Sequence, residues 1–158
     1  MSISDIIVVM KDGVVQQTGE PQSVYDDPKN LFVAKFLGTP PINVFDAKIS
    51  DGKLYIGDDA VMSVNIKGDM DVYAAIRPEG FVPKENGAFS ASLLRVEVMG
   101  RDISVVAKNP SCNTPSFRAI IGSETKPVIN TENVRFDILP FKVHLFDKAT
   151  EERIYFEV

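Results

Sequence analysis

The chain has 158 residues, of which 44% are hydrophobic and 25% charged, and this is typical of one soluble globular domain. Its net charge of −5 disfavours nucleic-acid binding, which depends on neutralising phosphates. The longest apolar runs are too short for a bilayer, and the N-terminus lacks the features of a signal peptide. Because Cys112 is the only cysteine, no internal disulfide is expected, and a reducing, cytoplasmic setting fits.

The first predicted element is a β-hairpin. Ile6 to Met10 is a continuous apolar run, Lys11-Asp12-Gly13 is a turn, and Val14 to Thr18 returns as a second strand. A strand that is apolar at every position is expected to be buried on both faces, under helices of a larger sheet.

Two short helices are predicted next. Pro21 is suited to a helix start, and Pro28 separates the first helix from a second that begins near Lys29. Phe32 and Phe36 are four residues apart and fall on one helical face. Gly38 fits the C-terminal cap of this helix, because the prolines that follow forbid its continuation.

After Asn43 the chain consists of short, often alternating β-like runs separated by turns such as Asp51-Gly52 and Gly100-Arg101. Gly87 and the stretch Lys108 to Ser116 are interpreted as exposed loops. Many short strands at this spacing predict a small barrel or sandwich. The predicted fold is therefore mainly β, an OB-like barrel or sandwich preceded by a β-hairpin and two short helices.

Few residues offer catalytic or metal chemistry. No phosphate-binding Gly-rich loop of the Walker A type is present, and a zinc site needs more ligands than one Cys and one His. A nucleophilic Cys112–His144 pair is conceivable, but a surface thiol and a histidine that supports the barrel edge are the plainer interpretations. The adjacent carboxylates fit solvated turns better than an acid/base pair, and they are Asp26-Asp27, Asp58-Asp59 and Glu151-Glu152.

The segment Ile76 to Gly80, IRPEG, is more distinctive. Pro78 should hold Arg77 in an extended conformation. Glu79 is then placed to pair with another chain, although a rigid turn with a weak surface ion pair is an equal interpretation.

A collinear pattern runs from Asp5 to Asn43. An aspartate precedes the hydrophobic strand, and glycines, prolines and aromatic residues follow in a set order: Gly13, Gln17, Gly19, Pro21, Tyr25, Pro28, Phe32-Val33-Ala34, Phe36, Gly38, Pro40 or Pro41, and Asn43. This pattern resembles the end of the nucleotide-binding domain in the ATP-binding subunits of ABC importers. The similar subfamily serves maltose, multiple sugars or glycerol phosphate.

Downstream, three segments resemble the transport-associated OB (TOBE) domain of that subfamily: Ile76 to Glu79, Val96 to Gly100, and Val143 to Asp147 with Arg153 and Ile154. The resemblance covers nearly the whole chain and is weaker from Ser104 to Asp137. It implies two parts, residues 1–42 from the end of a nucleotide-binding domain and residues 43–158 as a TOBE/OB-like regulatory domain.

The resemblance also implies that the family's Walker A, Q-loop, signature, Walker B and switch histidine precede this stretch, with Met1 at an internal methionine. Hydrolysis of ATP needs phosphate positioning, Mg²⁺ and a positioned water. We therefore expect no enzyme activity and no cofactor for this chain, with ATP and Mg²⁺ used only by a full-length parent.

As the resemblance implies, the C-terminal domains pair to form a homodimer below two membrane permease subunits, at the cytoplasmic face of the membrane. They can also receive a regulatory protein or a small-molecule signal. Nucleic acid is not an expected partner. The residues that the motifs assign to regulation or to an interface are Arg77, Glu79, Gly100, His144, Phe146 and Asp147. Preservation of turns and of barrel closure is an equal interpretation for each of them.

Three alternatives remain. The chain could be a stand-alone barrel that binds a small oxyanion or sugar, with Lys108 to Ser116 as the site. A nucleic-acid-binding OB barrel would need a basic groove with exposed aromatic residues. An enzyme in its own right has the least support.

Overall fold

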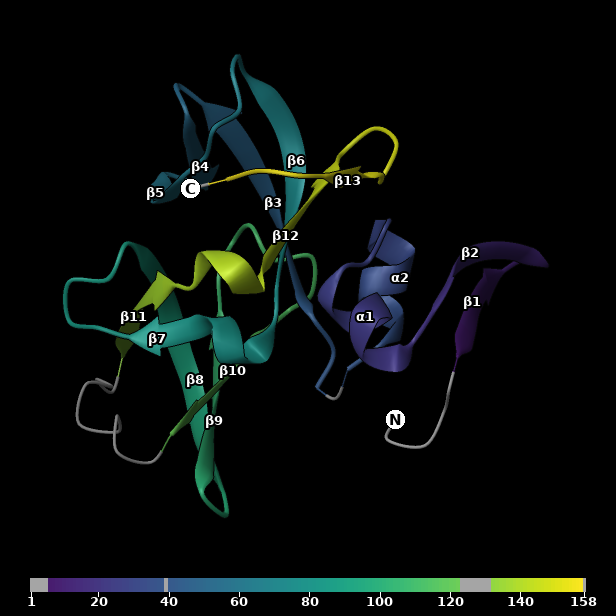
Figure 1. Cartoon of the computed structure of the whole chain (residues 1–158). Coiled ribbons are helices and arrows are strands. Elements are labelled where there is room, and N and C mark those ends of the chain that lie inside the picture. Colours follow the sequence, from purple (N-terminus) through teal and green to yellow (C-terminus); the bar gives the residue numbers. More distant parts are fainter. Residues whose placement is uncertain (1–5, 39, 123–131, 158) are drawn as a thin grey trace.

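The computed structural model describes residues 6–38, 40–122 and 132–157, so Asp5 of the predicted pattern lies outside the described residues. A hairpin and two short helices come first: β1 (Ile7–Lys11), β2 (Val14–Gly19), α1 (Pro21–Asp26) and α2 (Leu31–Phe36). The strands that follow are β3 (Asn43–Ser50), β4 (Lys53–Ile56), β5 (Asp59–Ser63), β6 (Met70–Ile76), β7 (Phe81–Pro83), β8 (Phe89–Met99), β9 (Asp102–Lys108), β10 (Phe117–Gly122), β11 (Asn133–Ile138), β12 (Val143–Asp147) and β13 (Arg153–Ile154) (Figure 1).

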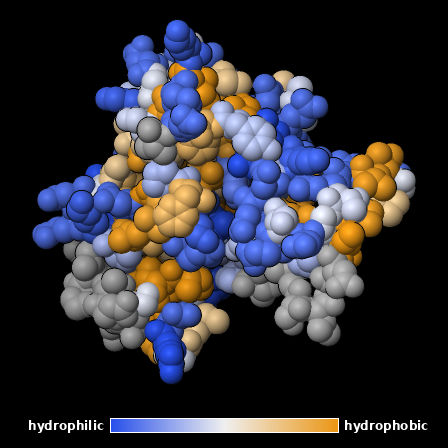
Figure 2. All heavy atoms as spheres, in the orientation of Figure 1, coloured by the Kyte–Doolittle hydropathy of each residue, from blue (hydrophilic) through white to orange (hydrophobic). Residues whose placement is uncertain are grey.

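The predicted hairpin is confirmed. Lys11 pairs with Val14, and Asp12 and Gly13 both have positive φ, as a two-residue hairpin turn of the primed type requires. The prediction that the first strand is buried on both faces is wrong, because Val9 is buried while Val8 and Met10 are half exposed. Only one face of this two-stranded sheet is covered, by Val24 of α1 and Val33 of α2. In Figure 2, hydrophobic residues gather on this hairpin at the right-hand edge of the molecule.

Both predicted helices form, and local chemistry sets their ends. Pro21 occupies the first turn of α1. The side chain of Asn30 caps α2 by accepting a hydrogen bond of 3.0 Å from the backbone N–H of Val33. Gly38 follows α2 with φ +109, so the glycine predicted at this cap is in a conformation that a side chain would strain.

The remaining strands form two antiparallel sheets, which confirms the predicted mainly β fold. The six-stranded sheet has the order β13-β12-β6-β3-β4-β5, and the five-stranded sheet has the order β10-β9-β8-β11-β7. The outer strands β10 and β7 of the second sheet also contact each other, so that sheet is nearly closed into a barrel. This arrangement is compatible with an OB-like domain.

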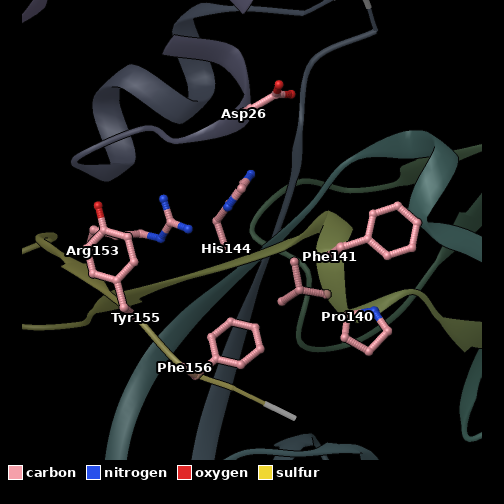
Figure 3. A pocket seen from close by; sticks show the side chains of 8 residues that line it. Asp26, Pro140, Phe141, His144, Arg153, Tyr155 and Phe156 are labelled. Atoms are coloured by element: carbon pink, nitrogen blue, oxygen red, sulfur yellow. The ribbon is translucent and has the colours of Figure 1, made fainter. Parts of the chain in front are cut away.

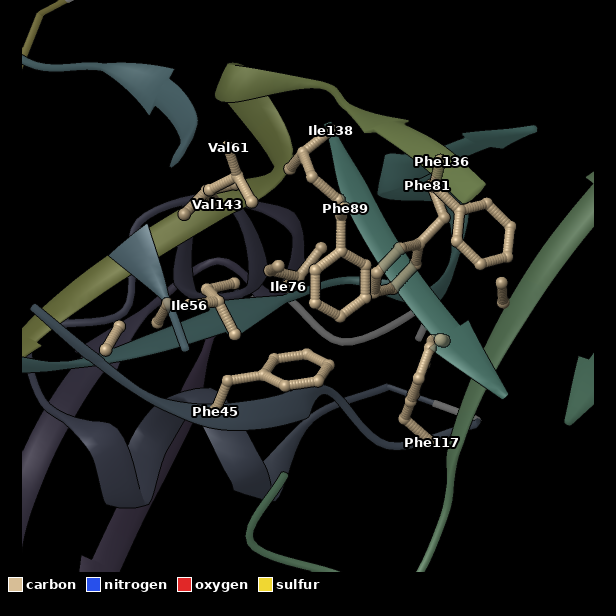
Figure 4. Close-up of a cluster of buried hydrophobic side chains, with 14 of the residues drawn as sticks. Phe45, Ile56, Val61, Ile76, Phe81, Phe89, Phe117, Phe136, Ile138 and Val143 are labelled. Carbon is tan, nitrogen blue, oxygen red and sulfur yellow. The ribbon is translucent and has the colours of Figure 1, made fainter. Parts of the chain in front are cut away.

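A cluster of phenylalanines joins the two sheets (Figure 4). Phe45 comes from β3 of the six-stranded sheet, and the other rings come from the five-stranded sheet: Phe81, Phe89, Phe117 and Phe136. The centroids of neighbouring rings are 5.2 to 6.4 Å apart, in the edge-to-face or tilted arrangements that aromatic rings prefer. This cluster is the centre of the main core.

Helix α2 covers the outer face of the six-stranded sheet. Leu31 and Ala34 pack there against Val44 of β3, Ala75 of β6 and Phe146 of β12. The middle of this sheet is therefore buried on both faces, and the N-terminal segment packs directly on the barrel.

Gly87 corrects another expectation. The sequence predicts an exposed loop at this position, but Gly87 is buried, and a Cβ atom there would lie 2.5 Å from the backbone carbonyl carbon of Phe136. The Arg135 Nε donates to the Gly87 carbonyl over 2.9 Å. A glycine is needed here because the backbone of β11 approaches so closely.

Candidate functional site

Arg77 links the barrel to the two helices. It follows β6 with φ −63 and ψ 147, the extended conformation expected before Pro78. Its side chain is only 1% exposed. One terminal nitrogen, Nη1, donates to the carbonyl oxygens of Leu37 (2.9 Å) and Ala34 (3.3 Å), and Nη2 donates to that of Tyr25 (2.8 Å). The guanidinium thus satisfies carbonyls at the C-terminal ends of both helices.

Tyr25 and Glu79 complete the surroundings of Arg77. The guanidinium carbon lies 3.9 Å from the centroid of the Tyr25 ring, and the Tyr25 hydroxyl donates to the Glu79 carboxylate over 3.0 Å. Lys142 forms an ion pair with the same carboxylate at 3.2 Å. Although burial opposes the charged form of Glu79, hydrogen bonds from its own backbone N–H, Tyr25 and Lys142 lower the pKa of this carboxyl overall. Arg77 and Glu79 therefore act in one connected group.

A second arginine fixes the same segment from the other side. Arg153 Nη1 donates to the Asp27 carboxylate and to the Pro28 carbonyl, both at 2.9 Å. Its guanidinium carbon lies 4.6 Å from the centroid of the Tyr155 ring, whose hydroxyl also bonds Asp27. We call Arg77 and Arg153, with the groups they bind on residues 25–37, the arginine clamp.

Backbone contacts strengthen the clamp. The N–H of Leu31 donates to the Glu151 carbonyl, and the N–H of Arg153 donates to the Lys29 carbonyl, both at 3.0 Å. The start of α2 is therefore tied to the turn between β12 and β13. Arg153 was identifiable from the sequence only as a motif position, because nothing local indicates that it meets residues 27 and 28.

His144 lies between the two arginines on the outer face of the six-stranded sheet. Its side chain is 5% exposed, and its Nδ1 is buried without a hydrogen-bond partner. Burial lowers the pKa of His144 from 6.5 to about 3, and the charges of Arg153, Arg77 and Lys142 act in the same direction. The imidazole is therefore neutral at pH 7.

Two hollows meet at His144 and form what we call the His144 groove. The smaller, of about 260 Å³, is lined by Tyr25, Asp26, Arg77, Phe141, Lys142 and His144. The larger, of about 470 Å³, is lined by Asp26, Pro140, Phe141, Val143, His144, Arg153, Tyr155 and Phe156. Figure 3 shows His144 between Arg153 on one side and Phe141 on the other, below Asp26 of α1.

The other three residues singled out by their motifs lie elsewhere. Phe146 is fully buried against α2. The Asp147 carboxylate accepts hydrogen bonds from the backbone N–H groups of Ala149 (2.8 Å) and Thr150 (3.2 Å), and so shapes the turn before β13. Gly100, with φ +68, lies in the turn between β8 and β9, at the far end of the long hairpin in Figure 1. The structure thus brings together Arg77, Glu79 and His144, and separates Gly100 from them.

Cys112 and His144 do not meet. Cys112 packs against the inner core, where it forms a β-bridge with Phe45. On β12, Val143 and Leu145 face that inner core, so His144, between them, faces outward. The six-stranded sheet therefore separates the two side chains.

The loop Lys108 to Ser116, considered above as an anion site, uses its polar groups within the fold. The Asn109 side chain donates to the Ser90 carbonyl (3.0 Å) and accepts from the Ser111 N–H (2.8 Å). The Thr114 hydroxyl donates to the Ser116 carbonyl. These polar groups therefore stabilise the conformation of the loop itself and its attachment to β8.

No helix among residues 6–38, 40–122 and 132–157 is long and apolar enough to cross a membrane. Within the same ranges, no group of three or more His, Cys, Asp or Glu side chains is arranged to hold a metal ion.

Comparison with known proteins places these features in context. No family model matches the chain. It is 29% identical to the diacetylchitobiose uptake system ATP-binding protein MsiK of Streptomyces coelicolor, over 98% of the chain and 47% of that protein. It is 32% identical to the oligosaccharides import ATP-binding protein MsmX of Bacillus subtilis, over 98% of the chain and 46% of that protein. The sn-glycerol-3-phosphate import ATP-binding protein UgpC of Psychromonas ingrahamii is 28% identical, over 98% of the chain and 43% of that protein.

The chain spans less than half the length of each of these relatives. Over nearly its whole length, it is similar to a part of the ATP-binding subunits of ABC importers.

Proposed function

We propose that this chain is the regulatory and dimerisation region of the ATP-binding subunit of a bacterial ABC importer for carbohydrates or related solutes. The observation that carries the proposal is the arginine clamp. The two guanidinium groups hold residues 25–37 against the barrel, so a movement of the N-terminal segment is passed to the barrel rather than absorbed by a loose linker.

We divide the chain into residues 1–42, as the end of a nucleotide-binding domain, and residues 43–158, as the regulatory barrel. In this proposal Arg77 and Glu79 transmit movement across the joint, together with His144, while Phe146 and Asp147 support it by packing and turn formation. ATP and Mg²⁺ are used by the remainder of the subunit. Membrane permease subunits are the proposed partners, and the cytoplasmic face of the membrane is the proposed location.

For dimerisation we propose the exposed apolar residues of the long β8–β9 hairpin. Leu94, Val96 and Val98 of β8 are 47%, 38% and 71% exposed. Apolar residues gathered at the surface are typical of contact sites between proteins. We propose a regulatory protein as a further partner of the same surface.

The test is analytical ultracentrifugation of the purified chain from 5 to 500 µM. A concentration-dependent dimer is expected, weakened by Val98→Lys and unaffected by the matched change Val14→Lys on the β1–β2 hairpin. A monomer at the highest concentration contradicts dimerisation through this chain. If Val14→Lys weakens the dimer and Val98→Lys does not, the dimer contact lies on the β1–β2 hairpin instead.

A second measurement tests the non-catalytic part of the proposal. Equilibrium dialysis of the chain with ATP and Mg²⁺ should show no stoichiometric binding, because we assign the phosphate-binding groups to the remainder of the subunit. Stoichiometric, Mg²⁺-dependent ATP binding by the isolated chain contradicts it.

A further inference from the structure

Three buried side-chain nitrogens in the described part of the chain have no hydrogen-bond partner: Arg77 Nε, His144 Nδ1 and Arg153 Nε. All three side chains line the His144 groove. Buried polar atoms are rarely left unpaired, since each costs free energy comparable to a lost hydrogen bond. Three side chains with spare hydrogen-bonding capacity thus converge on one groove, which is the arrangement of a site that receives a polar partner.

The missing partner must accept hydrogen bonds. The N–H groups of an arginine can only donate, and a neutral histidine donates from one of its two ring nitrogens. The surrounding cations are Arg77, Arg153 and Lys142, and they outweigh the carboxylate of Asp27 at the position of His144. Asp26 also lines the groove and opposes an anion there. An oxygen with negative charge suits the donors that lack partners.

The apolar lining and the volume of the His144 groove indicate the size and the carbon skeleton of the ligand. Phe141 and Tyr155 are 72% and 62% exposed, and Pro140 lies beside them on the groove. These apolar surfaces can contact a carbon skeleton. The larger hollow, of about 470 Å³, is within the range of sites for small molecules.

We propose that the His144 groove binds a small organic oxyanion, a phosphorylated or carboxylated metabolite. Its charged oxygens accept hydrogen bonds from His144 and Arg153, and its carbon skeleton rests on Phe141 and Tyr155. Since the same groove separates the two arginines of the clamp, an occupant contacts both the N-terminal segment and the barrel. The site does not depend on dimerisation, so each proposal can fail without the other.

The test is isothermal titration calorimetry of the whole chain with glucose 6-phosphate, citrate, inorganic phosphate and, as the neutral control, glucose. Binding of glucose 6-phosphate or citrate is expected, with glucose at least tenfold weaker. His144→Phe should weaken binding by about tenfold, which is the usual effect of losing one charge-assisted hydrogen bond. Asp26→Asn should strengthen binding several-fold by removing the opposing charge. Arg95→Gln, on exposed β8, should leave it unchanged.

A second readout works on the unmodified chain. His144 is the only histidine, so its imidazole gives a single set of NMR signals. A saturating oxyanion should shift those signals, whereas glucose should not. The proposal is overturned if no oxyanion binds at 10 mM, if glucose binds as tightly, or if binding leaves the His144 signals unmoved. Binding of inorganic phosphate alone, without the organic anions, also contradicts it.

Discussion

Strands β1 and β6 are both rich in apolar residues, but their surroundings differ. β6 lies between β12 and β3, with the phenylalanine core on one face and α2 on the other, and Val72, Ala74, Ala75 and Ile76 are fully buried. β1 has one neighbouring strand, and helices cover only one of its faces. An apolar strand therefore stabilises the fold only as far as other elements cover its faces, and β6 is covered on both faces while β1 is covered on one.

The largest expected effect is in the core next to β6. Phe45→Ala should lower the free energy of unfolding by about 3–5 kcal/mol, because it leaves a cavity among closely packed rings. Phe36→Ala is the matched control near the hairpin. Its ring is 58% exposed, so the loss should stay below about 1 kcal/mol. Urea unfolding measures the loss in both variants. Equal losses would contradict the difference in burial between the core next to β6 and the region near the hairpin.

The second effect depends on pH, through His144 on the outer face of β12. The folded pKa of about 3 lies below the ordinary value of 6.5, so the folded state binds fewer protons than the unfolded state between these values. The contribution of the neutral His144 to the free energy of unfolding is fully present above pH 6.5 and is lost as the pH is lowered. Between pH 6.5 and 4.5 the loss should be roughly 2–3 kcal/mol.

Urea unfolding at several pH values measures this loss, with His144→Gln as the comparison variant. Glu79, whose pKa is lowered from 4.5, adds its own loss only below that window. The variant should have a much flatter profile from pH 6.5 to 4.5. Parallel profiles for the two proteins would exclude His144 as the cause.

The arginine clamp should have a smaller and more local effect. Arg77→Met removes the donors to the carbonyls of Tyr25, Ala34 and Leu37, and should cost about 2 kcal/mol. Hydrogen exchange should rise in α1, α2 and the β1–β2 hairpin, while β3 and β8 keep their protection. Arg95→Met serves as the surface control. A uniform rise across the barrel would show that Arg77 supports the whole fold rather than the joint.

The smallest effect is expected on the open face of β1. Val8 is 51% exposed, so Val8→Thr should change the free energy of unfolding by no more than about 0.5 kcal/mol. Val72→Thr, the same substitution at a fully buried position of β6, should cost about 1–3 kcal/mol because a hydroxyl is buried. Similar values for the pair would mean that β1 is covered in solution.

Local chemistry made much of the fold predictable. The Asp12-Gly13 turn, the proline and glycine at the helix ends, and most strands follow from neighbouring residues. The short strand β7 and the irregular pairing in β8 near Leu93 did not, because the pairing with β9 and β11 decides them.

The site was less predictable, since its contacts join distant residues. Arg77 and Glu79 were singled out from the IRPE motif and His144 from the VHLFD motif, but their common group with Tyr25 joins positions more than 50 residues apart. The contact of Arg153 with Pro28 joins positions 125 apart. The buried position of Gly87 likewise depends on the backbone of Phe136 in another strand. Such contacts have no signal in a single local pattern.

The pairing of residues 29–31 with residues 151–153 has a consequence for biosynthesis. The short helices α1 and α2 are synthesised before the strands of the barrel, but Arg153 and the backbone groups of residues 151–153 that fix them are synthesised after nearly all of those strands. Helices of six residues are marginal without such support. Stable docking of these helices must therefore wait until residues 151–153 have also emerged from the ribosome, and until then both helices are available to chaperones or to a neighbouring subunit.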